Sequence, residues 1–266
     1  MDLQLTGKRA VVTGGSKGIG KACALFLARE GCDVALVSRT QADLDATASE
    51  IAAATGRTVI GVACDTGEDE SVRGMMRTVV ARLGGVDILV NAAAKPGGQQ
   101  PPPRLAEITD AAFNEDMNVK VLGYLRCARE AAPHMASNGW GRIINISGLA
   151  ARQTGSIIGS MRNVAVVALT KNLADELGPL GINVTVVHPG LTRTEATAGV
   201  IARRSAAQGI TPAEVESRMA EGNTVRRLID ASDIAAVVTF LASPLSVALN
   251  GDAIAAGGGA PRSIHY

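Results

Sequence analysis

The chain has 266 residues, a formal net charge of +1 and only 2% aromatic residues, a size that suits one large α/β domain as well as two small ones. It has no basic block and few rings for base stacking, so nucleic acid is not an expected partner. No window holds about 18 apolar residues, and Met1 to Lys8 has no leader pattern, so we expect a cytoplasmic protein without a membrane span.

Short apolar runs recur along the chain and read as strands. They lie at Arg9 to Thr13, Asp33 to Ser38, Thr58 to Ala63, Asp87 to Asn91, Arg142 to Ser147, Asn183 to His188 and Ala253 to Ala256. Runs that are apolar throughout are typical of strands buried on both faces of a parallel sheet. The four cysteines fall within apolar runs and lack the spacing of metal ligands, so we expect buried thiols and no metal site.

Helical patterns separate these strands. They cover Ile19 to Glu30, Gln41 to Ala54, Glu68 to Leu83, Ala111 to Met135 and Met161 to Leu177. Strands alternating with helices, joined by right-handed crossovers, predict the α/β class and a single-domain, Rossmann-type, doubly wound parallel sheet over residues 1–266.

Two segments interrupt the alternation. Lys95 to Arg104 is rich in proline and glycine and is expected to be a loop, whereas Glu195 to Val225 has helical pieces without a strand. We expect the second segment to be a helical insertion over the sheet edge. Both segments should emerge at the carboxyl ends of the strands, where ligands bind in such sheets, and form walls of a substrate site.

The first strand runs directly into a glycine-rich loop from Thr13 to Gly20, which opens the first helix. Glycines let a backbone turn tightly and approach a pyrophosphate, and the helix N-terminus offers free N–H groups and a positive dipole end. Between the first strand and helix of a βαβ unit, this loop predicts a dinucleotide site.

The second strand ends in Ser38-Arg39-Thr40, where an acidic residue would accept hydrogen bonds from the ribose hydroxyls of NAD. A guanidinium at this place suits the 2′-phosphate of NADP, and Lys17 adds positive charge on the same side. We therefore expect NADP(H) to be preferred over NAD(H).

Seven motifs together resemble the short-chain dehydrogenase/reductase family over nearly the whole chain. They are TGGSKGIG at 13–20, CD at 64–65, NAAA at 91–94, NVKV at 118–121, GRIINIS at 141–147, LTKNLADELGPLGINV at 169–184 and HPGLTRT at 188–194. The resemblance implies that Asp65 meets the adenine, that Asn91 lies beside the adenosine ribose and that Thr194 lies near the nicotinamide carboxamide.

The glycine loop, the end of the second strand and this resemblance together give the expected cofactor-binding set. Its members are Gly14, Ser16, Lys17, Gly18, Ile19, Gly20, Ser38, Arg39, Thr40, Cys64, Asp65, Asn91, Ala92, Ala93, Pro189, Gly190, Thr192 and Thr194.

The family's chemistry is usually carried by Asn, Ser, Tyr and Lys, with a tyrosine phenol as proton donor and a lysine that lowers its pKa. Alignment on the flanking motifs puts Gly148 at the serine position, Gly159 at the tyrosine position and Asn163 at the lysine position. The only tyrosines are Tyr124, expected to serve packing or a subunit contact, and Tyr266. The resemblance therefore implies an active site in which three of the four usual groups are replaced.

Three residues are the catalytic candidates. Asn118 matches the family's asparagine, and His188 ends the sixth strand with a side chain suited to proton transfer at neutral pH. Ser147 stands one residue before the serine position, and strand alternation would turn it to the opposite face. Further polar groups near the expected cleft are Lys95, Arg152, Arg162 and Arg193.

Three functions remain open on the sequence. The first is an NADP(H)-dependent oxidoreductase that acts on a carbonyl or hydroxyl group of a small molecule with an altered proton donor. The second is a non-catalytic NADP(H)-binding protein, such as a sensor or an oligomer subunit, and the third is a non-redox isomerase or lyase on the same fold. The resemblance also implies a homodimer or homotetramer in which the helices over Ala111 to Met135 and Ser160 to Leu177 pair between subunits.

Overall fold

A parallel sheet of seven strands organises the molecule, and a computed structural model describes residues 1–94 and 101–261. The strand order is β3-β2-β1-β4-β5-β6-β9, and every pairing is parallel. The strands are β1 (Arg9–Thr13), β2 (Asp33–Ser38), β3 (Val59–Ala63), β4 (Ile88–Asn91), β5 (Gly141–Ile146), β6 (Ile182–Pro189) and β9 (Ala253–Ala256). The predicted fold class is confirmed, and each predicted strand is present to within a residue or two.

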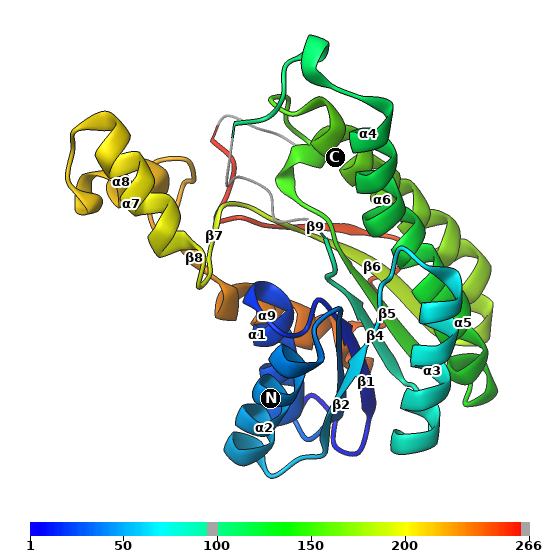
Figure 1. Cartoon of the computed structure of the whole chain (residues 1–266). Coiled ribbons are helices and arrows are strands. Elements are labelled where there is room, and N and C mark those ends of the chain that lie inside the picture. The colour runs from blue at the N-terminus through cyan, green and yellow to red at the C-terminus, as the bar shows by residue number, and fades with distance from the viewer. Residues whose placement is uncertain (95–100, 262–266) are drawn as a thin grey trace.

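Helices cover both faces of this sheet (Figure 1). One layer contains α1 (Gly18–Arg29), α2 (Gln41–Thr55) and α9 (Ala231–Ala242), and the other contains α3 (Asp69–Leu83), α5 (Gly123–Ser137) and α6 (Ile157–Leu177). Two large apolar clusters fill the spaces between sheet and helices, one on each face. The strands are consequently buried on both sides, as their apolar sequences predict.

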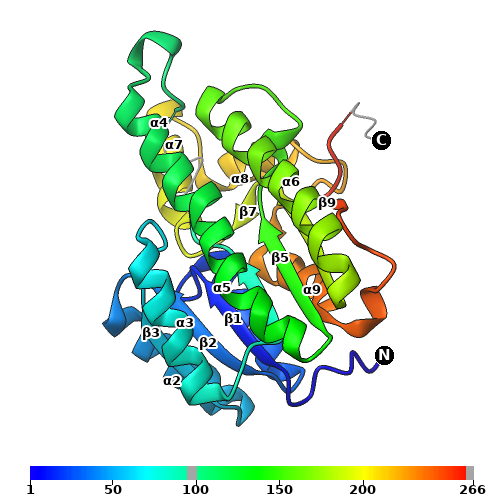
Figure 2. The same cartoon turned by 90° about the vertical axis from the view of Figure 1, so that its right-hand side faces the viewer.

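The helix predicted over Ala111 to Met135 is one rod made of three pieces. It begins as α4 (Asp110–Met117), passes through a π-helical turn, η2 (Asn118–Leu122), and continues as α5. Figure 2 shows α5 and α6 lying side by side on one face of the molecule. π turns inside α-helices occur frequently at functional sites.

The insertion predicted near residues 195–225 contains α7 (Thr197–Gln208) and α8 (Pro212–Ala220), with no strand inside it. Two short strands, β7 (Thr192–Arg193) and β8 (Ile229–Asp230), pair at its base. Figure 1 shows α7 and α8 projecting to one side of the upper end of the sheet. Neither this strand pair nor α9 was predicted, and the sequence of α9 is apolar on nearly every side, so it lacks a clear amphipathic period.

Four short 3₁₀ turns lie in the described part of the chain: η1 (Leu105–Glu107), η3 (Leu149–Ala151), η4 (Gly178–Leu180) and η5 (Pro244–Ser246). Residues 101–104 form no regular element, as expected for the second half of the proline-rich segment. The side chain of Lys95, named above as a cleft candidate, lies outside the described residues. Among the residues that the structure covers, no helix is long and apolar enough to span a membrane.

Candidate functional site

The glycine loop connects β1 to α1 at the point where the strand order reverses. Gly14 has φ +67°, and a Cβ there would lie 2.8 Å from the carbonyl oxygen of Ala92. A Cβ on Gly20 would overlap the carbonyl of Gly14. Side chains are therefore excluded from the inner side of this loop, so an anion can approach the backbone at the start of α1, where the N–H of Gly18 donates to the Glu195 carboxylate at 3.0 Å.

The chain after β4 is fixed to the same loop. Thr13 Oγ1 accepts hydrogen bonds from the backbone N–H of Ala92 at 3.0 Å and of Ala93 at 3.1 Å. From the other side, a Cβ on Gly18 would lie 3.4 Å from Thr194 Cγ2, so Thr194 borders the loop. Ser16 accepts a hydrogen bond on its backbone oxygen from Thr47 in α2. The structure thus brings together predicted residues of three segments: the glycine loop, the chain after β4 and the chain after β7.

The end of β2 carries two polar groups without partners. Ser38 Oγ is buried and makes no hydrogen bond within residues 1–94 and 101–261, and Arg39 is exposed and forms no ion pair there. Lys17, predicted to add positive charge at this place, forms a salt bridge of 2.8 Å with Asp43, and both side chains are largely exposed. Thr40 is the N-terminal cap residue of α2.

The ends of β3 and β4 lie on either side of this region. Cys64 is buried, and burial raises the pKa of its thiol, as expected for a packing residue. Asp65 is exposed, and its Oδ1 accepts the backbone N–H of Gly67 at 2.9 Å. Asn91 is fully buried, and its Nδ2 donates to Asn145 Oδ1 at 3.0 Å. Its Oδ1 has no partner among the described residues and is sealed from solvent at the end of β4.

Asn118 opens the π turn and is held from two sides. Its Nδ2 donates to the backbone oxygen of Gly67 at 3.1 Å, and its Oδ1 accepts from Arg126 Nη1 at 2.8 Å. These bonds fix the turn against the segment that follows β3. Asn118 therefore links the segment after β3 to the start of α5 through its side-chain hydrogen bonds.

The three positions that the resemblance aligns with the usual serine, tyrosine and lysine, Gly148, Gly159 and Asn163, lie in the loop after β5 and in α6. A Cβ on Gly148 would lie 3.2 Å from Asn163 Nδ2, so these two positions are neighbours. Gly159 lies in the first turn of α6, where its N–H bonds the capping side chain of Ser156. Ser147 Oγ donates to the backbone oxygen of Asn163 at 3.1 Å.

The expectation that Ser147 and position 148 face opposite sides does not hold, because both residues lie beside Asn163. Strand alternation does not apply because β5 ends at Ile146, and both residues lie in the loop that follows. Both consequently contact Asn163, one through its hydroxyl and one through close approach.

Lys120 was not among the predicted site residues, yet it lies at the centre of this group. Its side chain is 4% exposed, and its Nζ donates to the backbone oxygen of Ser147 at 2.9 Å and to Asn163 Oδ1 at 3.0 Å. Burial and, to a lesser extent, the nearby Arg162 lower the pKa of this ammonium to about 7, and Asp116 opposes the shift. The one signal in the sequence is a lysine between two valines in an otherwise apolar stretch.

His188 lies in β6, opposite Ala255 of β9, and is 1% exposed. Pro189 ends the strand, and Gly190 approaches the backbone of Gly257 so closely that a Cβ would lie 2.9 Å from its Cα. Thr192 Oγ1 donates to the oxygen of Gly190 at 3.1 Å. This turn directs the chain from the sheet towards Thr194.

The remaining polar candidates and Tyr124 have structural partners. Arg152 donates to the oxygen of Ala253 at 3.0 Å, Arg162 pairs with Asp116, and Arg193 pairs with Asp230 and Glu216. Tyr124 is buried, and its hydroxyl donates to the oxygen of Ile146 at 2.9 Å. The packing role expected for Tyr124 is confirmed.

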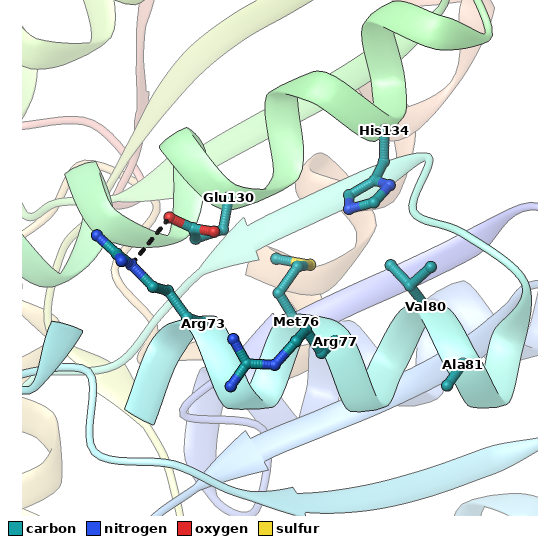
Figure 3. Close-up of a pocket in the computed structure, with 7 residues that line it drawn as sticks. All are labelled: Arg73, Met76, Arg77, Val80, Ala81, Glu130 and His134. Atoms are coloured by element: carbon teal, nitrogen blue, oxygen red, sulfur yellow. Dashed lines mark ion pairs between the residues drawn. The ribbon is translucent and has the colours of Figure 1, made fainter. Parts of the chain in front are cut away.

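Two surface grooves lie away from these residues. One runs between α3 and α5, where Arg73 pairs with Glu130 at one end and His134 lies at the other (Figure 3). The other runs between α5 and α6 and includes Leu125, Ala132 and Leu180. Neither groove includes a residue of the expected cofactor-binding set.

Comparison with known proteins gives consistent matches. A family model described as enoyl-(acyl carrier protein) reductase matches residues 14–260. The short-chain reductase protein NovJ of Streptomyces niveus is 35% identical over 253 residues, which cover 95% of this chain and 93% of that protein. A short-chain type dehydrogenase/reductase of Sinorhizobium fredii, y4mP, is 31% identical over 261 residues and covers 96% and 98% of the two chains.

Among solved structures, an L-sorbose reductase from Gluconobacter frateurii complexed with NADPH and L-sorbose superposes with a TM-score of 0.92. It is 28% identical, and the match covers 99% of this chain and 100% of that one. An actinorhodin polyketide ketoreductase with NADPH gives a TM-score of 0.87 at 29% identity, with 96% and 98% covered.

Proposed function

This chain belongs to the short-chain dehydrogenase/reductase family, and we propose that it is an NADP(H)-dependent oxidoreductase acting on a carbonyl or hydroxyl group of a small molecule. The observation that carries the proposal is the end of β2, where the exposed Arg39 guanidinium forms no ion pair within the described ranges. A phosphate on the adenosine ribose would pair with this guanidinium through charge-assisted hydrogen bonds.

The other residues of the site also fit this dinucleotide. The loop from Gly14 to Gly18 would hold the pyrophosphate on backbone N–H groups. Asp65 is exposed after β3, where the adenine would lie, and Thr194 borders the glycine loop at the nicotinamide side. The L-sorbose reductase and the ketoreductase, both similar in fold, were solved with NADPH.

We further propose that the active site is atypical. When bound, NADPH supplies a hydride to a carbonyl carbon, and the family's usual arrangement uses a tyrosine to protonate the oxygen. Here Gly159 stands at the tyrosine position, and Tyr124 is sealed in the core. Asn163 stands at the lysine position, and its polar neighbours are Ser147 and Lys120.

The helical insertion of α7 and α8 is proposed to form a wall of the substrate site. It follows directly on Thr194 and Glu195, and Glu195 contacts the glycine loop. The carboxyl ends of the neighbouring strands β4, β5 and β6 lie between the glycine loop and the insertion. Sheets of this kind bind small ligands in the crevice beyond these strand ends, so a small molecule is the substrate class that the arrangement favours.

Two measurements test the proposal. Fluorescence titration with NADPH and with NADH gives the two dissociation constants, and consumption of NADPH against ketones, aldehydes and enones gives turnover. Tight NADPH binding with turnover of at least one carbonyl supports the proposal. Binding without turnover supports a non-catalytic NADP(H)-binding protein, and absence of binding refutes both.

The role of His188 in proton transfer stays a prediction. His188→Ala should lower turnover well beyond any effect on NADPH affinity if the imidazole takes part. An unchanged turnover in a folded His188→Ala variant would remove it from the site.

A further inference from the structure

A buried lysine occupies the π turn next to the replaced active-site positions. Lys120 is 4% exposed, and its Nζ is held by two oxygens, the carbonyl of Ser147 and the side chain of Asn163. A buried amine requires hydrogen-bond partners, because transfer of a charge out of water is costly. The π turn directs this residue inward, where its Nζ reaches Asn163 of α6.

Asn163 uses its acceptors but not its donor. Its Oδ1 accepts from Lys120, and its backbone oxygen accepts from Ser147 Oγ. Its Nδ2 donates to no atom of residues 1–94 and 101–261, and it is not among the sealed unpaired polar atoms of this part of the chain. Because a Cβ on Gly148 would lie 3.2 Å from this nitrogen, Nδ2 faces a position where no side chain fills the space.

This geometry places an oriented N–H donor beyond the carboxyl end of β5. Gly148 is partly exposed, so an oxygen atom of a ligand can approach where a serine side chain would stand. Lys120 fixes the amide in this orientation, because an ammonium donates to Oδ1 and cannot accept from Nδ2. The orientation of the amide is therefore set by the lysine.

We propose that Asn163 Nδ2 donates a hydrogen bond to the carbonyl oxygen of the substrate, and that Lys120 is the positioning residue that orients and polarises this amide. The proposal rests on the proposed oxidoreductase function and adds to it the group that stabilises the negative charge on oxygen.

In the proposed reduction, the carbonyl carbon gains a hydride, with its electron pair, from the reduced nicotinamide, which is oxidised in the same step. The π electrons of the carbonyl move to oxygen, where the N–H of Asn163 stabilises the charge. A water molecule supplies the proton that completes the alcohol, since an amide does not release its own proton near neutral pH.

A positive charge on Lys120 should strengthen the hydrogen bond that Asn163 Nδ2 donates. Burial lowers the pKa of Lys120 to about 7, with Arg162 of α6 lowering it and Asp116 of α4 raising it. Arg162 and Asp116 form an ion pair with each other, so they offset one another in part. The ammonium form predominates below about pH 7, and there the amide of Asn163 is most strongly polarised.

Asn163→Asp is the first test, because it replaces the donor nitrogen by an oxygen and keeps the oxygen that binds Lys120. Loss of one such donor lowers kcat by roughly 10²–10³-fold in other oxyanion sites, and we expect a loss in this range. The dissociation constant of NADPH should change by less than about threefold, since the residue does not meet the adenosine half. An unchanged kcat in Asn163→Asp would overturn the proposal.

Lys120→Met tests the positioning role through its pH profile. The wild type should lose activity as pH rises through about 7, whereas Lys120→Met should be about tenfold slower at pH 6 and nearly equal to the wild type at pH 9. Lys120→Arg should retain part of the low-pH activity. The matched control is Lys171→Met, which removes an exposed lysine from α6 and should leave the profile unchanged.

A readout without turnover completes the test. The side-chain amide resonance of Asn163, identified by its loss in Asn163→Asp, should shift with a midpoint near pH 7 in the wild type and should not titrate in Lys120→Met. If the wild type binds NADPH but reduces no carbonyl, the proposed function is refuted, and the roles of Asn163 and Lys120 with it. If the wild type is active, but Lys120→Met keeps its pH profile and the amide resonance of Asn163 does not shift with pH, only the roles of Asn163 and Lys120 are refuted.

Discussion

Glu195 Oε2 accepts a hydrogen bond of 3.0 Å from the backbone N–H of Gly18, the first residue of α1. A carboxylate from the segment that leads into the insertion thus lies at the positive end of the helix that should receive the pyrophosphate. Cofactor binding must displace this carboxylate, so the contact couples the insertion to the cofactor site.

Glu195→Gln should therefore tighten NADP(H) binding. Removing the negative charge removes both the competition for Gly18 and the repulsion of the incoming phosphates, and we expect the dissociation constant to fall by about three- to tenfold, in line with helix-terminus effects. Fluorescence titration at low ionic strength measures it. Glu221→Gln, at the end of α8, is the control for a changed surface charge. Weaker binding in Glu195→Gln would contradict the competition.

Arg39→Asp should reverse the cofactor preference. Arg39 has no ion pair in the described structure, so its charge is available to a 2′-phosphate, and a charge-assisted pair contributes about 1.5–3 kcal/mol. NADPH affinity should fall by roughly 10–100-fold, with NADH affinity raised or unchanged. Arg77→Asp, an exposed position on α3, controls for the change in net charge. Equal affinities of the wild type for both cofactors would refute the preference.

The stability of the protein should depend on pH through Lys120. Its pKa is lowered to about 7 in the folded state, below about 10.4 for an unfolded chain. Between these values the unfolded state binds one more proton, so the free energy of unfolding rises with pH by about 1.4 kcal/mol per unit. Below about pH 7 both states hold the proton, and this group adds no pH dependence. Urea unfolding at pH 7 and pH 9 should show a gain of about 2–3 kcal/mol that Lys120→Met lacks.

In the same experiment, the free energy of unfolding of Lys171→Met should depend on pH as that of the wild type does. Equal slopes in the wild type and Lys120→Met would show that the lysine titrates in the folded state as it does in water.

A homodimer is predicted through α5 and α6. Leu125 is 38% exposed and Leu180 is 47% exposed, and both line the groove between these helices. Leu125→Glu should convert the assembly to smaller species in light scattering, because a buried charge without a partner opposes association. Val247→Glu, a more exposed apolar position outside this groove, should not. A monomeric wild type at micromolar concentration would refute the prediction.

Rebuilding the usual tyrosine at position 159 meets a local obstacle. A Cβ on Gly159 would lie 2.7 Å from Ser156 Oγ, which caps α6 by accepting the N–H of Gly159 at 3.1 Å. Gly159→Ala should therefore cost about 1 kcal/mol, the usual contribution of a helix cap. In a Ser156→Gly background the same change should cost little, and chemical unfolding of the four proteins measures the coupling. The tyrosine should therefore be introduced by Gly159→Tyr in the Ser156→Gly background.

Much of the fold could be predicted because its signals are local. The strands from Arg9–Thr13 to Ala253–Ala256 are apolar over their length, and the glycine loop stands directly between a strand and a helix. The active-site group around Lys120 could not be predicted in the same way. Its lysine reaches Asn163, 43 residues away, only because a π turn directs it inward. Alternation also failed at Ser147, because the strand ends one residue earlier.

The π turn has a further consequence for the rod that contains it. A π turn holds more residues than an α turn, so α4 and α5 are out of phase with the faces that one uninterrupted α-helix would present. Removing a single residue from Asn118–Leu122 would restore regular winding and rotate everything before it by about 100° relative to α5. The length of this short stretch therefore sets the angular offset between the Asp116–Arg162 pair and the part of α5 that packs on the sheet.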